Sequence, residues 1–119
     1  MQTTQNITST IIEAIQDKKG QKITTIDLSH LEMSSASEFI ICQGRSTSQV
    51  AAIADNIRDE LSSRLHIKPY HYDGYRNSQW IILDYGSTMI HIFLPEVREF
   101  YNLEELWGDG VMTEIPDLD

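Results

Sequence analysis

In the second half of the chain, two apolar runs on either side of a polar turn predict a β-hairpin. Residues 80–83 and 89–93 are almost wholly apolar, and the glycine-containing segment 84–88 separates them. Two short apolar runs on either side of a turn are typical of antiparallel strands with a tight connection. We therefore expect these two strands to be the centre of the fold.

The register of this hairpin follows from the length of its loop. With an even loop, either Tyr85-Gly86 or Gly86-Ser87, odd positions of the first strand share a face with even positions of the second. One face then has only aliphatic side chains, which are Ile81, Leu83, Ile90 and Ile92. The other face is mixed and has Trp80, Ile82, Asp84, Met89, His91 and Phe93.

The two faces predict different roles. The aliphatic face suits a core covered by helices, whereas aromatic and Met side chains with a carboxylate and a histidine are typical of a surface that binds a partner protein. An alternative with equal support is a second helix layer over the mixed face, which would make Trp80 and Phe93 ordinary core residues.

The rest of the chain predicts helices around this sheet. Helical spacing of apolar residues indicates helices at 7–15 and 46–65, and Pro95-Glu96 and Asn102 with Glu105 are start signals for helical segments that end near Gly108. β-Branched or continuous apolar runs indicate further strands at 23–28, 38–43 and 70–72. We expect a loop or a broken turn of helix at 30–37 and a flexible, acidic tail at 109–119.

This order of elements predicts an α+β (mixed α/β) fold. We expect a single domain with a mixed sheet of about five strands flanked by helices. A length of 119 residues is enough for one domain with its own core.

Composition narrows the classes of partner. The net charge of −9 opposes binding to the phosphate backbone of DNA or RNA and favours a basic protein partner. No apolar run approaches the length of a membrane span, and the amino terminus resembles neither a signal nor a transit peptide, so we expect a cytoplasmic protein. The single cysteine, Cys42, lies in an apolar run and is expected to be a buried hydrophobe rather than a catalytic thiol.

Candidate chemistry in the sequence is weak. His66, His71 and Asp73 match no common metal-ligand spacing, and no metal or other cofactor is expected. Gly44-Arg45-Ser46, between a strand and a helix, could bind an anion, but a tight turn with a helix cap is the simpler interpretation. No pair of carboxylates at alternate strand positions is present to hold catalytic metals. We therefore predict no catalytic residues, and the alternative is a nucleotide- or phosphate-binding enzyme.

Several short motifs together resemble a known family. The second half contains Trp80–Gly86, His91-Ile92-Phe93, 98–104 and Leu106-Trp107. The first half adds, in order, Asp27-Leu28-Ser29, Phe39-Ile40-Ile41-Cys42, Gly44-Arg45-Ser46 and Ala52-Ile53-Ala54-Asp55. The pattern is similar to the ribosomal silencing factor family, also called the Iojap family, within a domain at 1–108. The chain departs from that family at Glu38-Phe39 and at Leu94.

The resemblance implies a non-enzymatic protein that binds ribosomal protein fourteen of the large subunit and blocks joining of the small subunit when nutrients are scarce. It also implies a nucleotidyltransferase-like fold without the active site, and homodimers of the free protein.

The mixed hairpin face becomes the expected docking surface under this resemblance. Trp80, Ile82, Met89 and Phe93 would be apolar anchors, and Asp84 would pair with a basic residue of the partner. Arg98 and Tyr101 are secondary candidates, and Trp107 is expected to support the fold. If Trp80 is a hot spot of the interface, Trp80→Ala should weaken binding by about 2 kcal/mol or more, and Asp84→Lys should slow association.

Overall fold

A mixed sheet of six strands with helices on both faces forms the structure. The computed structural model describes residues 4–31 and 36–118, and within them no helix is long and apolar enough to cross a membrane. The expected loop at 30–37 lies partly outside the described residues. The elements in chain order are α1 (Thr4–Asp17), β1 (Gln21–Asp27), β2 (Glu38–Gln43), α2 (Thr47–Leu65), β3 (His71–Asp73), β4 (Trp80–Asp84), β5 (Thr88–Phe93), α3 (Pro95–Tyr101), α4 (Leu103–Leu106) and β6 (Val111–Ile115).

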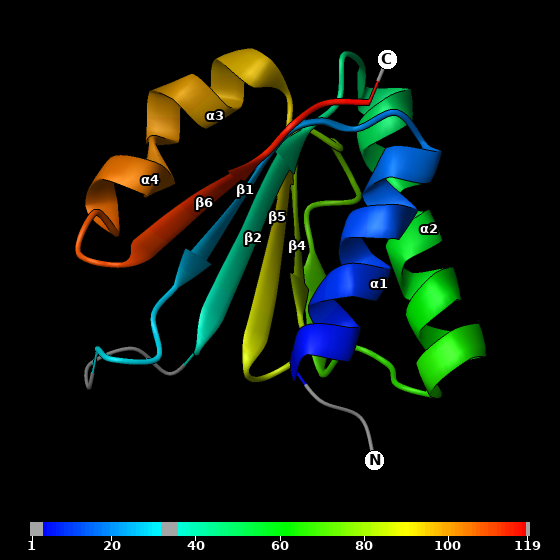
Figure 1. Cartoon of the computed structure of the whole chain (residues 1–119). Coiled ribbons are helices and arrows are strands. Elements are labelled where there is room, and N and C mark those ends of the chain that lie inside the picture. Colours follow the sequence, from blue (N-terminus) through cyan, green and yellow to red (C-terminus); the bar gives the residue numbers. More distant parts are fainter. Residues whose placement is uncertain (1–3, 32–35, 119) are drawn as a thin grey trace.

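The strand order in the sheet is β3-β4-β5-β2-β1-β6. All neighbouring strands are antiparallel except β2 and β5, which pair in parallel at the centre. Helices α1 and α2 cover one face, and α3 and α4 lie on the other (Figure 1). The expected α+β class is confirmed, with six strands rather than about five.

The α1–α2 layer seals the larger core. In α2, the side chains of Val50, Ile53, Ala54, Ile57 and Leu61 are buried along one stripe, as the sequence predicted. Ser46 caps this helix because its hydroxyl accepts a hydrogen bond from the N–H of Gln49 at 3.1 Å. Helix α1 adds Ile11, Ala14 and Ile15 to the same core.

The hairpin has the predicted register. Trp80 is opposite Phe93, Ile82 is opposite His91, and Asp84 is opposite Met89. The loop is Gly86-Ser87, because the N–H of Tyr85 donates to the carbonyl of Thr88 at 2.9 Å. The aliphatic set Ile81, Leu83, Ile90 and Ile92 is completely buried against the α1–α2 layer.

The expected solvated tail is wrong for β6. Residues 111–115 form an edge strand antiparallel to β1, in which Ile115 pairs with Ile23 and Val111 with Asp27. Gly110 lets the chain enter this strand, because a Cβ at that position would clash with the side chain of Ile26. The ordered sheet therefore extends past the expected boundary at residue 108.

Candidate functional site

Helices α3 and α4 cover only part of the mixed hairpin face. Phe93 is 0% exposed and His91 is 4% exposed. They lie in a second core that also contains Phe39 and Leu103, with Trp107 packed against it. Phe93 and His91 therefore support the surface and do not offer contact area, which corrects their assignment as partner-binding residues. The second helix layer that the sequence left open as an alternative exists, but it is incomplete.

A hydrogen bond and ring contacts hold Trp80 above this core. Its indole N–H donates to Nδ1 of His91 at 3.1 Å, and its ring stacks on Phe93 with centroids 5.0 Å apart. The ring of Tyr101 contacts the ring of Trp80, with centroids 4.7 Å apart. Burial lowers the pKa of His91 to about 4, so the imidazole is neutral near pH 7 and can accept this bond. The Trp80 ring is thus held in place at the border of the covered region.

The uncovered part of the face displays four of the predicted residues. Trp80, Ile82, Asp84 and Met89 are all partly exposed. They form what we call the open hairpin face, in which large apolar side chains lie beside one carboxylate. Such a composition suits the centre and rim of a protein interface.

A cleft next to Trp80 extends this surface toward α3. It has a volume of about 480 Å³ and is lined in part by Trp80, Val97, Phe100 and Tyr101. Tyr101 is 50% exposed and Phe100 is 80% exposed. Tyr101 was predicted from the sequence as a partner-binding residue, but Phe100 was not. Two adjacent aromatic residues in a short helix are a usable signal, because a helix that packs on one side only cannot bury both.

Asp84 has a local role in addition to its position on the open face. Its Oδ1 accepts a hydrogen bond from the N–H of Gly86 at 2.8 Å, which stabilises the hairpin loop. A change to Lys would remove this bond together with the charge. Asp84→Asn retains an acceptor oxygen and removes only the charge, so it is the cleaner test of pairing with a partner.

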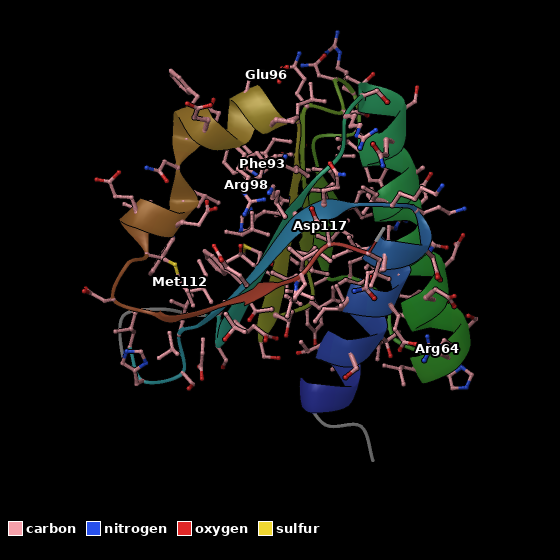
Figure 2. All side chains as sticks on the ribbon, turned by 45° about the horizontal axis from the view of Figure 1, so that its top comes forward. Arg64, Phe93, Glu96, Arg98, Met112 and Asp117 are labelled. Atoms are coloured by element: carbon pink, nitrogen blue, oxygen red, sulfur yellow. The ribbon has the colours of Figure 1, made fainter. Side chains whose placement is uncertain are left out.

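Arg98 is a structural residue, which corrects its assignment as a secondary partner-binding residue. It lies between α3 and the sheet near Phe93 (Figure 2), and only 9% of its surface is exposed. Its guanidinium donates to Glu104 through Nε at 3.0 Å and to the carbonyl of Lys22 at 2.7 Å. Further bonds reach Gln43 and Thr24, so three hydrogen bonds hold α3 against β1 and β2, and the two to Glu104 hold it to α4.

The candidate chemical sites have structural explanations. Gln49 accepts a hydrogen bond from the N–H of Arg45 at 2.7 Å and donates to Ser46, so the 44–46 segment is a capped turn. Cys42 is completely buried, and burial raises the pKa of its thiol to about 12, which makes it a poor nucleophile. Among residues 4–31 and 36–118, no group of three or more His, Cys, Asp and Glu residues is placed to hold a metal ion.

Comparison with known proteins points to one family. A family model described as "Ribosomal silencing factor during starvation" matches residues 1–119. The ribosomal silencing factor RsfS of Halalkalibacterium halodurans is 31% identical over 111 residues, which is 93% of each chain. The chloroplastic Iojap protein of Zea mays is 41% identical over 78 residues, which is 66% of this chain and 33% of that protein.

A solved structure agrees with this similarity. A crystal structure of a protein from Chromobacterium violaceum superposes with a TM-score of 0.85 at 33% identity. The match covers 90% of this chain and 88% of the other. Sequence and fold therefore agree over nearly the whole length, and the chain belongs to the ribosomal silencing factor (RsfS) family.

Proposed function

We propose that this chain is a translation repressor that binds the large ribosomal subunit through ribosomal protein fourteen. Bound there, it blocks joining of the small subunit and lowers translation when nutrients are scarce. The family match over residues 1–119 supports this class of function. The relation of its sheet to nucleotidyltransferases stays a prediction.

The open hairpin face is the observation that carries the proposal. On the same two strands, the side chains that face α1 and α2 are completely buried, whereas Trp80, Ile82 and Met89 on the other face remain partly exposed. Large apolar side chains that a fold leaves uncovered next to each other mark a site of protein contact. The bond from Trp80 to His91 fixes the largest of them, which lowers the entropy lost on binding.

Charge supports a basic ribosomal protein as the partner. The net charge of −9 would steer the chain toward a cationic surface and away from exposed ribosomal RNA. Asp84 is placed on the open face, where it would orient the complex and raise the association rate more than the affinity.

The mechanism needs affinity and bulk rather than catalysis. A folded domain that occupies the space between the subunits prevents their contact for as long as it stays bound. The affinity for the large subunit and the concentration of the chain then determine the fraction of subunits that is blocked.

Subunit joining in a sucrose gradient tests this mechanism. Large subunits are incubated with the chain before small subunits and magnesium are added, and joined ribosomes are quantified. We expect fewer joined ribosomes as the chain is added, and no such effect when joined ribosomes are formed first and remain closed. Full joining at saturating occupancy of the large subunit would contradict steric exclusion.

A further inference from the structure

Strand β6 forms an open edge of the sheet, at the side opposite the short strand β3. Within the described part of the chain it pairs with β1 alone, and four of its five residues are exposed. An edge strand presents a row of backbone N–H and C=O groups that can pair with another strand. The strand itself contains neither Lys nor Pro, the residues that usually prevent such pairing.

The part of the sequence that contains β6 is strongly acidic. Residues 95–119 contain eight of the 18 Asp and Glu residues but only one of the nine Lys and Arg residues, so most of the net charge lies in this quarter of the chain. The one basic residue is Arg98, whose guanidinium is fully used by Glu104, Thr24, Gln43 and Lys22. Glu104 is paired with this guanidinium, and Asp117 accepts a hydrogen bond from the N–H of Lys22. Glu114, on β6 itself, is therefore the groove carboxylate best placed to meet a cationic partner.

A groove runs between β6 and the α3–α4 layer. Its volume is about 880 Å³, and Met112, Glu114 and Asp117 from the carboxyl-terminal segment line it. The opposite wall has Glu104 and two basic residues, Lys22 and Arg98. Met112 pairs with Ile26 and Glu114 with Thr24, so both face the α3–α4 side of the sheet. Figure 2 shows Met112 and Asp117 along β6 and the segment after it, with Arg98 between them and α3.

Exposed apolar side chains add contact area along the strand. Val111 is 60% exposed and Met112 is 39% exposed. Alternate side chains of an added strand would therefore meet the groove with Glu114 on one face of the sheet, and Val111 on the other. Backbone pairing gives affinity in this mode of binding, and the alternating side-chain sites give specificity.

We propose that β6 binds an extended lysine- or arginine-rich segment of a protein partner, which adds to the sheet as a seventh strand. Charge selects this occupant: a nucleic acid would be repelled by the carboxylates, and so would β6 of a second copy of this chain. The site is separate from the open hairpin face, because β2 and β1 lie between β5 and β6. The proposal for β6 therefore does not depend on whether the hairpin binds the ribosome.

Titration of the full, isotope-labelled chain with defined peptides tests this site by NMR. The probe is a capped heptapeptide in which lysine alternates with threonine and valine. Two further peptides of the same sequence are N-methylated at alternate amides, so that between them they block both edges of the added strand. We expect saturable shifts of the amides of residues 111–115 and 117, and at least one N-methylated peptide should bind about tenfold more weakly.

Two charge variants provide the matched comparison. Glu114→Lys should weaken binding of the unmodified peptide by about tenfold, whereas Asp59→Lys, the same change of charge on α2, should alter it by less than about twofold. The amide spectrum of each variant shows whether it is folded.

Four results would overturn the proposal. The first is equal affinity of all three peptides, which would reveal attraction between charges without strand pairing. The second is a set of shifts located away from residues 111–117, and the third is the absence of saturable shifts. The fourth is concentration-dependent broadening of the amides at 111–115 before any peptide is added, which would identify a second copy of the chain as the occupant.

Discussion

The two faces of the β4–β5 hairpin differ in chemistry and in cover. Ile81, Leu83, Ile90 and Ile92 are completely buried under α1 and α2. On the other face, His91 and Phe93 are buried under the α3–α4 layer, whereas Ile82, Asp84 and Met89 are partly exposed. The hairpin residues 80–84 and 89–93 thus contribute to both a sealed core and an incompletely covered one.

The difference in cover between the two faces predicts that one face determines stability and the other determines binding. Two long helices seal the aliphatic face, and any truncation there leaves a cavity. On the mixed face, α3 and α4 contain only seven and four residues and leave the turn end of the hairpin uncovered. Substitutions on the first face should therefore lower stability, and substitutions at the turn end of the second should mainly lower affinity.

The largest expected effect is on the sealed face. Ile90→Ala removes a completely buried side chain from the core below α2 and should lower the free energy of unfolding by about 2–5 kcal/mol. Urea denaturation followed by circular dichroism measures this change. A loss similar to that of a surface substitution would show that the two faces are equally tolerant.

Acid should destabilise the buried part of the mixed face through His91. Its pKa is lowered from 6.5 to about 4 by burial, so between these values the unfolded chain binds a proton that the folded chain does not. The stability that comes from keeping His91 neutral is fully present above pH 6.5. The free energy of unfolding should fall by about 2–3 kcal/mol by pH 4.5 because the unfolded chain binds this proton.

Urea unfolding at a series of pH values tests the role of His91. His91→Gln should lack this component of the acid sensitivity, while the titration of the carboxylates remains in both proteins. Parallel profiles of the wild type and the variant would contradict the burial of a neutral imidazole.

Truncation of Arg98 should weaken the attachment of the incomplete layer. Arg98→Ala leaves Glu104 and the carbonyl of Lys22 without their donor and should cost about 2 kcal/mol, because Glu104 remains partly exposed to water. Hydrogen exchange should rise in α3 more than in α2. Uniform exchange over both helices would show that Arg98 does not act locally.

The smallest effect on stability is expected at Met89, which is adjacent to Ile90, the site of the largest effect. Met89 adjoins Ile90 in β5 but lies on the opposite face, where it is partly exposed and packs only at the margin of the second core. Met89→Ala should therefore lower the free energy of unfolding by only about 1 kcal/mol. The same urea experiment compares the two neighbours directly. Equal losses at positions 89 and 90 would remove the distinction between the faces.

Local patterns in the sequence were sufficient to predict much of this arrangement. The even length of the hairpin loop was sufficient to predict which residues of 80–84 and 89–93 share a face, and a slip of one residue would have turned the aliphatic set outward. The apolar stripe of α2 and the cap at Ser46 were predicted from spacing alone and are confirmed.

Long-range packing explains the predictions that failed. Strand β6 has few buried residues, and its pairing with β1 joins segments about 90 residues apart, so no local pattern indicates it. Alternation also cannot say how much of a face a short helix covers. For that reason the sequence did not predict that Phe93 is buried while Trp80, its partner across the hairpin, is partly exposed. It also did not predict that Arg98 is buried.

Sedimentation with purified large ribosomal subunits tests the role of the open hairpin face most directly. The wild type is compared with Met89→Lys, which places a charge on the open face, and with Asp59→Lys as a control of charge on α2. We expect the wild type and Asp59→Lys to sediment with the subunits and folded Met89→Lys to remain in the supernatant. Sedimentation of Met89→Lys at the wild-type level would contradict docking through this face.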